Sequence, residues 1–215
     1  MPIKIKSLTL GPFATNAYLV ADTETNSAIL IDPVDDAPAI LAAAEDAGWE
    51  IKLMIATHAH LDHVLASAEV KRQLQIPFLI HEDCKALLAE IPLQGLYFGL
   101  GQLPEAAQPD RLLKDNDIVE LDSMRLLSLY TPGHAPGHLS FYLAERKILF
   151  SGDSLFAGSI GRTDLPGGDH DLLLNSIFTR LLTLDDDVHV LPGHMGATTI
   201  GREGLTNPFL LSYRP

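Results

Sequence analysis

The residues of this sequence that can do chemistry are concentrated in one short run, THAHLDH at positions 57–63. His58 and His60 are two apart in extended backbone and project to the same side, whereas Asp62 and His63 fall in the first turn of a helix and point elsewhere. Imidazole and carboxylate are ligands that zinc, iron and manganese accept. The run therefore predicts ligands for two neighbouring metal positions.

Three further ligand-type residues each follow a β-rich run and a glycine-containing turn. They are His134 after TPG, Asp153 after SG and His194 after LPG. Functional groups that short turns hold at one edge of a sheet form a preorganised site. Burying several titratable groups together carries a free-energy cost that only a bound metal offsets. Isolated histidines are instead expected to be structural: His81, His170 and His189.

Two divalent ions a few ångströms apart would lower the pKa of a shared water toward neutrality and polarise a carbonyl oxygen. The predicted nucleophile is a hydroxide that bridges the metals, with Asp62 and Asp153 as the catalytic residues that orient it. The metals, and not a protein oxyanion hole, would stabilise the developing alkoxide. A serine nucleophile is not expected, because neither Ser151 nor Ser154 stands in a G-x-S-x-G elbow.

Length and composition favour one globular domain over residues 1–215, with 47% hydrophobic and 20% charged residues and no linker or repeat. The single cysteine, Cys84, excludes an intrachain disulfide framework and indicates a reducing compartment, so a cytoplasmic protein is expected. Cys84 itself is expected to be a small buried thiol on the helix after His81. No apolar run approaches the roughly 18 residues that a membrane span requires.

The charge balance restricts the partners. Lys and Arg number 15 against 28 Asp and Glu, which gives a formal net charge of −13. Nucleic acid or an anionic membrane would need a basic footprint, so neither is expected as a partner. A small-molecule substrate is expected instead.

The elements that must position these residues are strands in two series, with helices between them. The segment Pro38–Ala47 is an Ala-rich helix that Gly48 ends, and helices are also predicted over Asp62–Gln75 and Asp171–Leu184. Two strand-rich halves of this kind predict two sheets covered by helices on the outside. The predicted strands are Ile3–Leu10, Asn16–Ala21 and Ser27–Ile31 in an antiparallel opening, then Glu50–Thr57, Pro77–Ile80, Asp117–Leu121, Met124–Tyr130, Leu139–Leu143, Lys147–Phe150 and Val188–Leu191.

The segment Pro92–Pro109 is rich in Gly, Pro and Leu and is long for a connection. It is therefore either a functional loop or one that carries small helices of its own. Tyr97 and Phe98 make it a candidate lid over the pocket, although packing is the favoured role of such apolar loop residues.

The His-x-His-x-Asp-His signature, with the later His134, Asp153 and His194, resembles the metallo-β-lactamase superfamily over essentially all 215 residues. The strings TPGHAPGH at 131–138, GDSLF at 152–156, GRTD at 161–164 and NPF at 207–209 are similar to those of single-domain glyoxalase II-like hydrolases of the YcbL type. The resemblance implies an α/β fold, the αββα sandwich, with two mixed sheets flanked by helices and the metals at one edge.

The resemblance also implies the ligand sets. One metal is held by His58, His60 and His134, a second by Asp62, His63 and His194, and Asp153 bridges both. Zinc is the first expectation for the two divalent ions, with iron or manganese as alternatives. A bridging Asp153 resembles the hydrolases of thioesters, lactones and phosphodiesters, whereas the best-known zinc β-lactamases carry cysteine in that region.

The implied activity is hydrolysis of a small thioester, in the first place S-2-hydroxyacylglutathione such as S-lactoylglutathione, to a 2-hydroxy acid and glutathione. Arg162 is the candidate for binding a substrate carboxylate, since a guanidinium suits that group, and an ion pair with Asp164 is the equally weighted alternative. His138 is expected to hydrogen-bond backbone or to support a ligand.

Two other activities occur on the same scaffold. Persulfide dioxygenases share the Gly-Arg-Thr-Asp string but use one iron, held by the equivalents of His58, His134 and Asp153. Retention of His194 and the rest of the second set favours two metals and hydrolysis. A phosphodiesterase, nuclease or lactonase is less favoured, and the net charge argues against long nucleic acid as a substrate.

Overall fold

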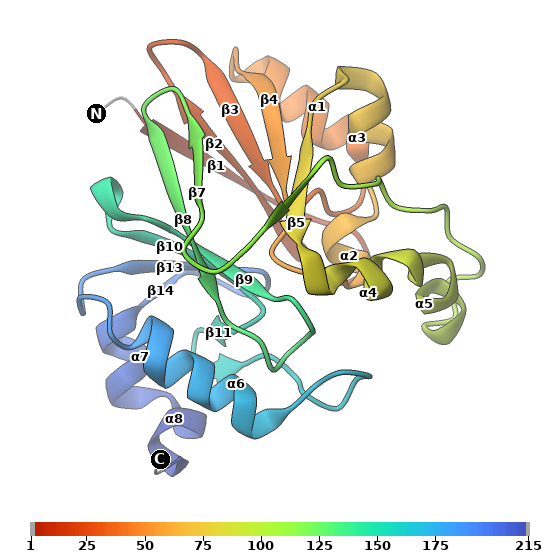
Figure 1. Ribbon diagram of the computed structural model, residues 1–215. Coiled ribbons are helices and arrows are strands. Elements are labelled where there is room, and N and C mark those ends of the chain that lie inside the picture. Colours follow the sequence, from red (N-terminus) through yellow and green to blue (C-terminus); the bar gives the residue numbers. More distant parts are fainter. Residues whose placement is uncertain (1–2, 214–215) are drawn as a thin grey trace.

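Two six-stranded sheets lie face to face in the computed structural model, which describes residues 3–213 (Figure 1). The first sheet has the order β1-β2-β3-β4-β5-β6, and its first three strands are antiparallel while the later neighbours are parallel. The predicted antiparallel opening is confirmed. The strands are β1 (Ile3–Leu10), β2 (Thr15–Asp22), β3 (Ser27–Ile31), β4 (Glu50–Ile55), β5 (Phe78–His81) and β6 (Arg111–Leu113).

The second sheet has the order β14-β13-β10-β9-β8-β7 and is also mixed, because β10 and β13 are parallel and the other neighbours antiparallel. Two more strands, β11 (Leu155–Phe156) and β12 (Ser159–Ile160), form a separate hairpin. The sheet comprises β7 (Ile118–Leu121), β8 (Met124–Tyr130), β9 (Leu139–Leu143), β10 (Ile148–Gly152), β13 (His189–Pro192) and β14 (Thr198–Thr199).

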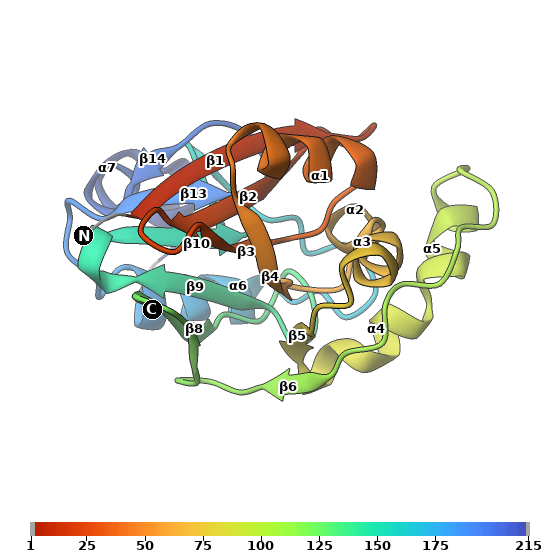
Figure 2. The ribbon, with the colours of Figure 1, turned by 90° about the horizontal axis from the view of Figure 1, so that it is seen from above.

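Helices cover the outer faces of both sheets (Figure 1). On the first sheet lie α1 (Ala37–Asp46), α2 (Leu61–Val64) and α3 (Ser67–Leu74), and on the second lie α6 (His170–Ser176), α7 (Ile200–Thr206) and α8 (Pro208–Ser212). After β5 the chain forms the 3₁₀ turn Glu82–Cys84, α4 (Lys85–Ala89) and α5 (Ile91–Tyr97), which extend to one side (Figure 2). The expected sandwich of two mixed sheets flanked by helices is confirmed. In the described part of the chain, no helix is long and apolar enough to cross a membrane.

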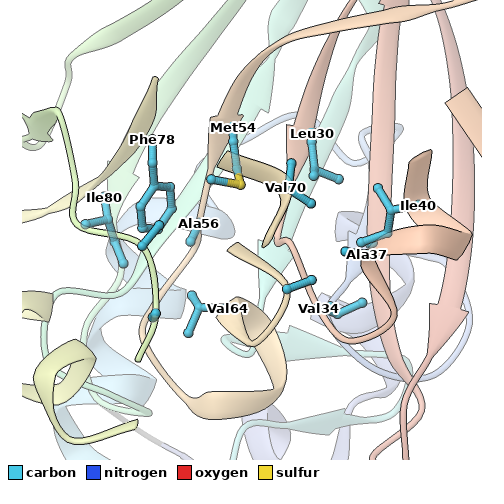
Figure 3. Close-up of a cluster of buried hydrophobic side chains, with 14 of the residues drawn as sticks. Leu30, Val34, Ala37, Ile40, Met54, Ala56, Val64, Val70, Phe78 and Ile80 are labelled. Carbon is cyan, nitrogen blue, oxygen red and sulfur yellow. The ribbon is translucent and has the colours of Figure 1, made fainter. Parts of the chain in front are cut away.

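The central strands of the first sheet are buried on both faces, as near-continuous apolar runs predict. Successive side chains of a strand point to opposite faces. In β4, Met54 therefore packs beneath the helices (Figure 3), whereas Leu53 and Ile55 pack between the sheets. In β5 the same alternation places Phe78 and Leu79 on opposite faces. These strands are thus held from both sides, which makes their ends rigid supports.

The predicted helix Asp62–Gln75 is wrong as one element. α2 ends at Val64 and α3 begins at Ser67. The backbone N–H of Ala66 donates to the carbonyls of Pro33 and Val34, at 3.1 and 2.6 Å, so tertiary contacts replace the helical hydrogen bond there. The break separates the ligand-bearing turn from the helix that covers the sheet.

Two other predictions change in detail. The helix predicted over Asp171–Leu184 begins at His170 and is α-helical only to Ser176, after which residues 177–181 form a π turn. Within Pro92–Pro109, the first residues belong to α5, so the alternative of a small helix is right for that part. Cys84 is buried as expected, although in the 3₁₀ turn.

Candidate metal centre

The predicted ligands gather at one edge of the sandwich because they follow strands that end there. β9 is antiparallel to both β8 and β10, and β10 is parallel to β13, so β8, β10 and β13 all end at the same edge. The residues that follow these three strands are His134, Asp153 and His194. His58 and His60 follow β4 of the other sheet. The structure thus brings together all seven predicted positions.

One set of ligand atoms is made of three buried imidazoles. The Nδ1 atom of His60 lies 3.0 Å from His58 Nε2 and 2.8 Å from His134 Nε2. Burial lowers the pKa of His58 well below its usual value, and it lowers that of His60 to about 3. All three rings are therefore neutral at physiological pH and can present lone pairs to a cation.

The second set combines a carboxylate with two imidazoles. Asp62 Oδ2 lies 3.2 Å from His194 Nε2 and 3.5 Å from His63 Nε2. Burial alone would lower the pKa of His194, but the carboxylates of Asp153 and Asp62 raise it to about 10. A positive charge is therefore stabilised at this position, whether it is a proton or a cation.

Asp153 lies between the two sets. Its Oδ1 is 3.4 Å from His63 Nε2, and its Oδ2 is 3.5 Å from His134 Nε2 and 3.3 Å from His194 Nε2. Burial would raise the pKa of this carboxyl, but the charge of His63, the hydrogen bond from His194 and the charge of His134 hold it well below its usual value. Asp153 is thus ionised and faces both sets.

The donor atoms fit divalent metal ions. Three groups of ligand atoms lie within 4.8 Å of one another: His58, His60 and His134; His58, His63 and Asp153; and Asp62, His63 and His194. Within the described residues, His63 Nε2 and Asp153 Oδ1 are buried and have no hydrogen-bond partner. Unpaired buried polar atoms are rare and costly, and a cation between them would remove that cost.

Asp32 supports the centre and was missed by the sequence reasoning. Its carboxylate accepts hydrogen bonds from Thr57 N at 2.6 Å, from Thr57 Oγ1 at 2.9 Å and from His63 Nδ1 at 2.9 Å. The bond to His63 directs that ring's Nε2 toward the other ligands and makes it more basic. In the sequence, the signal for this role is an aspartate before a proline, directly after β3. This strand pairs with β4, and the histidine run follows β4.

Other supporting contacts come from both sheets. Thr15 Oγ1 donates to Asp62 Oδ2 at 2.7 Å, and His134 Nδ1 donates to the backbone carbonyl of Arg162 at 2.7 Å. His138 is fully buried, and its Nε2 accepts from the backbone N–H of Asp153 at 3.0 Å. The supporting role expected for His138 therefore agrees with its contacts, and it leaves this histidine outside the ligand sets.

Gly193 leaves room for two of the ligands. A Cβ atom at this position would lie 2.2 Å from Asp153 Oδ1 and 2.7 Å from His63 Cε1, far inside contact distance. The turn is held by the first sheet, because Asn16 N donates to Gly193 O at 2.7 Å and Tyr18 Oη donates to Pro192 O at 2.7 Å. Only glycine allows the His194 turn to approach the centre this closely.

Arg162 lies at the rim of the centre. Its Nε and Nη2 atoms each donate to a carboxylate oxygen of Asp164 at 2.7 Å, so the ion pair weighed as an alternative is present. The Arg162 side chain is nonetheless 55% exposed and lines a cavity of about 200 Å³ with His60, Asp62 and His194. Its role in substrate binding stays a prediction.

Comparisons with known proteins agree with the geometry. The model of the metallo-beta-lactamase superfamily matches residues 10–194. The hydroxyacylglutathione hydrolase GloC of Haemophilus influenzae is 40% identical over 98% of this chain and 99% of its own. The human mitochondrial persulfide dioxygenase ETHE1 is 27% identical over 97% of this chain and 76% of its own.

Solved structures show the same fold. One titled as the BLEG-1 B3 metallo-beta-lactamase has a TM-score of 0.90 and 38% identity, covering 96% of this chain and 99% of its own. Another, titled TTHA1623 in a di-iron-bound form, has a TM-score of 0.86 and 40% identity, covering 95% and 100%. The relatives and the histidine and aspartate cluster support a metal-dependent hydrolase that takes divalent ions. This chain belongs to the metallo-β-lactamase superfamily.

Proposed function

We propose that the protein hydrolyses small thioesters, in the first place S-2-hydroxyacylglutathione such as S-lactoylglutathione. The observation that carries the proposal is the complete second ligand set beside the first, with Asp153 facing both. The identity to a hydroxyacylglutathione hydrolase supports the same substrate class. The small-molecule partner and the cytoplasmic location expected from the sequence belong to this proposal.

In this proposal His58, His60 and His134 hold one divalent ion, Asp62, His63 and His194 hold the other, and Asp153 contacts both. Zinc is the first candidate, with iron or manganese as alternatives. When bound, the two ions supply an activated water and polarise the thioester carbonyl.

The protein's own residues orient the reactants. Burial would raise the pKa of Asp62, but His63, His194 and Thr15 lower it to about 2, so its carboxylate accepts a hydrogen bond from the attacking water. Asp153 is ionised as well, and its carboxylate, which faces both ligand sets, orients the same water. The Arg162 guanidinium lines the same cavity and is placed to bind a carboxylate of the glutathione moiety. A thiolate leaving group needs little protonation, so no separate acid is required.

The test is hydrolysis of S-lactoylglutathione by protein loaded with zinc, iron or manganese, followed through loss of the thioester absorbance. We expect turnover that falls at least about a hundredfold in Asp153→Asn, because the carboxylate that faces both ligand sets is lost. A panel of other thioesters and a β-lactam serves as comparison, since one similar structure is titled a B3 metallo-beta-lactamase. Full loading with each metal and no hydrolysis of any thioester would falsify the proposal.

A second candidate is a persulfide dioxygenase with one iron at His58, His134 and Asp153. The relationship to ETHE1 favours it, and His134 Nε2 lies 3.5 Å from Asp153 Oδ2. Oxygen consumption with glutathione persulfide separates the two activities. The variant His194→Ala also separates them, because it removes a candidate ligand of the second set, which only the hydrolase needs. It leaves the three residues of the one-iron site in place.

A further inference from the structure

We propose that the site, besides accepting a lactoyl group, favours thioesters whose acyl group is apolar and about six carbons or larger, bound in a cavity between α5 and Leu165–Pro166 beside His60. This inference rests on the proposed thioesterase function and specifies the substrate class within it. The cavity measures about 240 Å³. An apolar protein cavity of roughly 150 Å³ already holds a benzene molecule, so the space suffices for a phenyl or hexyl group.

The cavity adjoins the metal centre. The cavity at the centre contains His134, Asp62 and His194, and it shares three lining residues with the cavity beside α5. A substrate whose carbonyl lies over the ligand atoms can therefore extend along His60 toward α5. The three shared residues are His60, Phe98 and Leu165.

The walls beside α5 suit an uncharged group. Most of the lining is apolar, and among the described residues its only acidic or basic side chain besides His60 is Glu90, which repels a carboxylate. The polar side chain of Gln94 is occupied, because its Oε1 accepts from Leu61 N at 2.8 Å and its Nε2 donates to Leu87 O at 3.0 Å. The apolar lining residues are Leu87, Leu93, Tyr97, Phe98, Leu165 and Pro166.

Exposed apolar side chains of α5 would favour binding of the acyl group. Leu93 and Tyr97 are 62% and 72% exposed, and they are four residues apart, which places them on the same face of the helix. Both line the cavity. An acyl group seated there would cover apolar surface that is otherwise in contact with water, and such burial is favourable at about 25 cal/mol per Å².

The position of the Arg162 guanidinium indicates how the substrate is oriented. Arg162 lines the central cavity and the one formed with Phe156 and Met195, but it does not line the cavity beside α5. The carboxylates of glutathione therefore belong on the Arg162 side, and the acyl group belongs beside α5. A lactoyl group, with three carbons and a hydroxyl, would leave most of the apolar cavity unfilled.

Binding tests the cavity without turnover. Non-hydrolysable S-alkylglutathiones from methyl to octyl are titrated into the metal-loaded full chain by calorimetry. We expect affinity to rise with each methylene up to about six carbons, by at most about fourfold per methylene, which is the value for a fully buried methylene. In the matching kinetic series, kcat/KM should rise with the length of the acyl group on glutathione, and lengthening the thiol of a fixed acetyl thioester should have no such effect.

Two leucines of α5 provide a matched pair of variants. Leu93 lines the cavity, whereas Leu96 is 56% exposed on the same helix and does not line it. Leu93→Gln should flatten the dependence on alkyl length to below about twofold per methylene, and Leu96→Gln should leave it unchanged. Equal affinity for methyl and hexyl thioethers, or equal effects of the two variants, would overturn the proposal. Failure of S-lactoylglutathione hydrolysis with a preserved alkyl dependence would count against the activity and not against the cavity.

Discussion

At the scale of single residues, the centre depends on side chains that hold the ligands as much as on the ligands themselves. Asp32 is 2% exposed and joins the end of β3 to the start of the histidine run through Thr57 and His63. Its backbone has a φ of 54°, a left-handed conformation that aspartate tolerates better than most residues. Both the backbone conformation and the hydrogen bonds of the carboxylate therefore favour aspartate at this position.

Replacing Asp32 with alanine should weaken metal binding by about ten- to a hundredfold, because His63 loses the partner that sets its orientation and basicity. Metal content after dialysis against a chelator measures this effect. Asp22→Ala is the control, since Asp22 is also 2% exposed but accepts from Glu24 N and Ser123 N, away from the ligands. Equal metal loss in both variants would contradict the role of Asp32.

Arg162 makes a second prediction at this scale. Arg162→Ala should raise the KM for S-lactoylglutathione about tenfold with little change in kcat, because the lost contact is to a carboxylate remote from the reacting bond. The carbonyl that accepts from His134 belongs to the backbone and is retained. Asp164→Asn should lower the KM, since it frees the guanidinium from its present partner. A neutral thioester is the control, and an equal loss on that substrate would contradict the prediction.

At the scale of elements, the C-terminal helices hold the hairpin that leads to Arg162. Glu203 of α7 is fully buried and accepts from Gly158 N at 2.8 Å, in the turn between β11 and β12. Asn207, between α7 and α8, donates from Nδ2 to Ser159 O at 3.0 Å and to Glu203 Oε2 at 2.8 Å. These short helices therefore contribute to the site through the hairpin, although they supply none of the ligands.

Asn207→Ala should destabilise the folded protein by about 2 kcal/mol, because it leaves the part-buried Ser159 carbonyl and a buried Glu203 carboxylate oxygen short of a donor and removes the cap of α8. This corresponds to a fall in Tm of roughly 4–8 °C for a chain of this size. Thr206→Ala is the matched control, because its exposed hydroxyl bonds only to Arg202 O within α7. Similar Tm values for the two variants would show that the hairpin does not depend on this contact.

At the scale of the whole molecule, the net charge of −13 opposes the approach of an anionic thioester. Near the centre, Arg162 is the one lysine or arginine among the described residues that line its cavity, and the positive charge stabilised at His194 lies beside it. Long-range repulsion and local attraction therefore act in opposite directions on the same substrate.

Raising the ionic strength from about 10 to 150 mM should increase kcat/KM for S-lactoylglutathione, because the Debye length shortens from about 30 to 8 Å and screens the distant charges most. Stopped-flow or initial-rate measurements at low substrate concentration follow the change. A neutral thioester should show no increase, and a decrease for the anionic substrate would mean that the local cation dominates.

The sequence by itself identified the candidate ligands and the kind of fold. His58 and His60 are two residues apart in extended backbone, and Asp62 and His63 lie in the turn that follows. Both patterns are local, so these four residues were identified without any tertiary information. Strand periodicity also placed the main strands to within one or two residues. Short elements held by neighbours were missed, such as α7 and β14, because their stability comes from packing and not from a repeating pattern.

Only the tertiary structure decided which residues support the ligands and where a substrate can lie. Asp32 is 31 residues from His63 in the chain, and no local pattern reports their contact at 2.9 Å. The break before α3 depends on carbonyls of another loop, and the cavity beside α5 has walls from segments as distant in the chain as Leu93 and Leu165. Such features arise from contacts between distant segments, whose partners are set once two sheets have packed together.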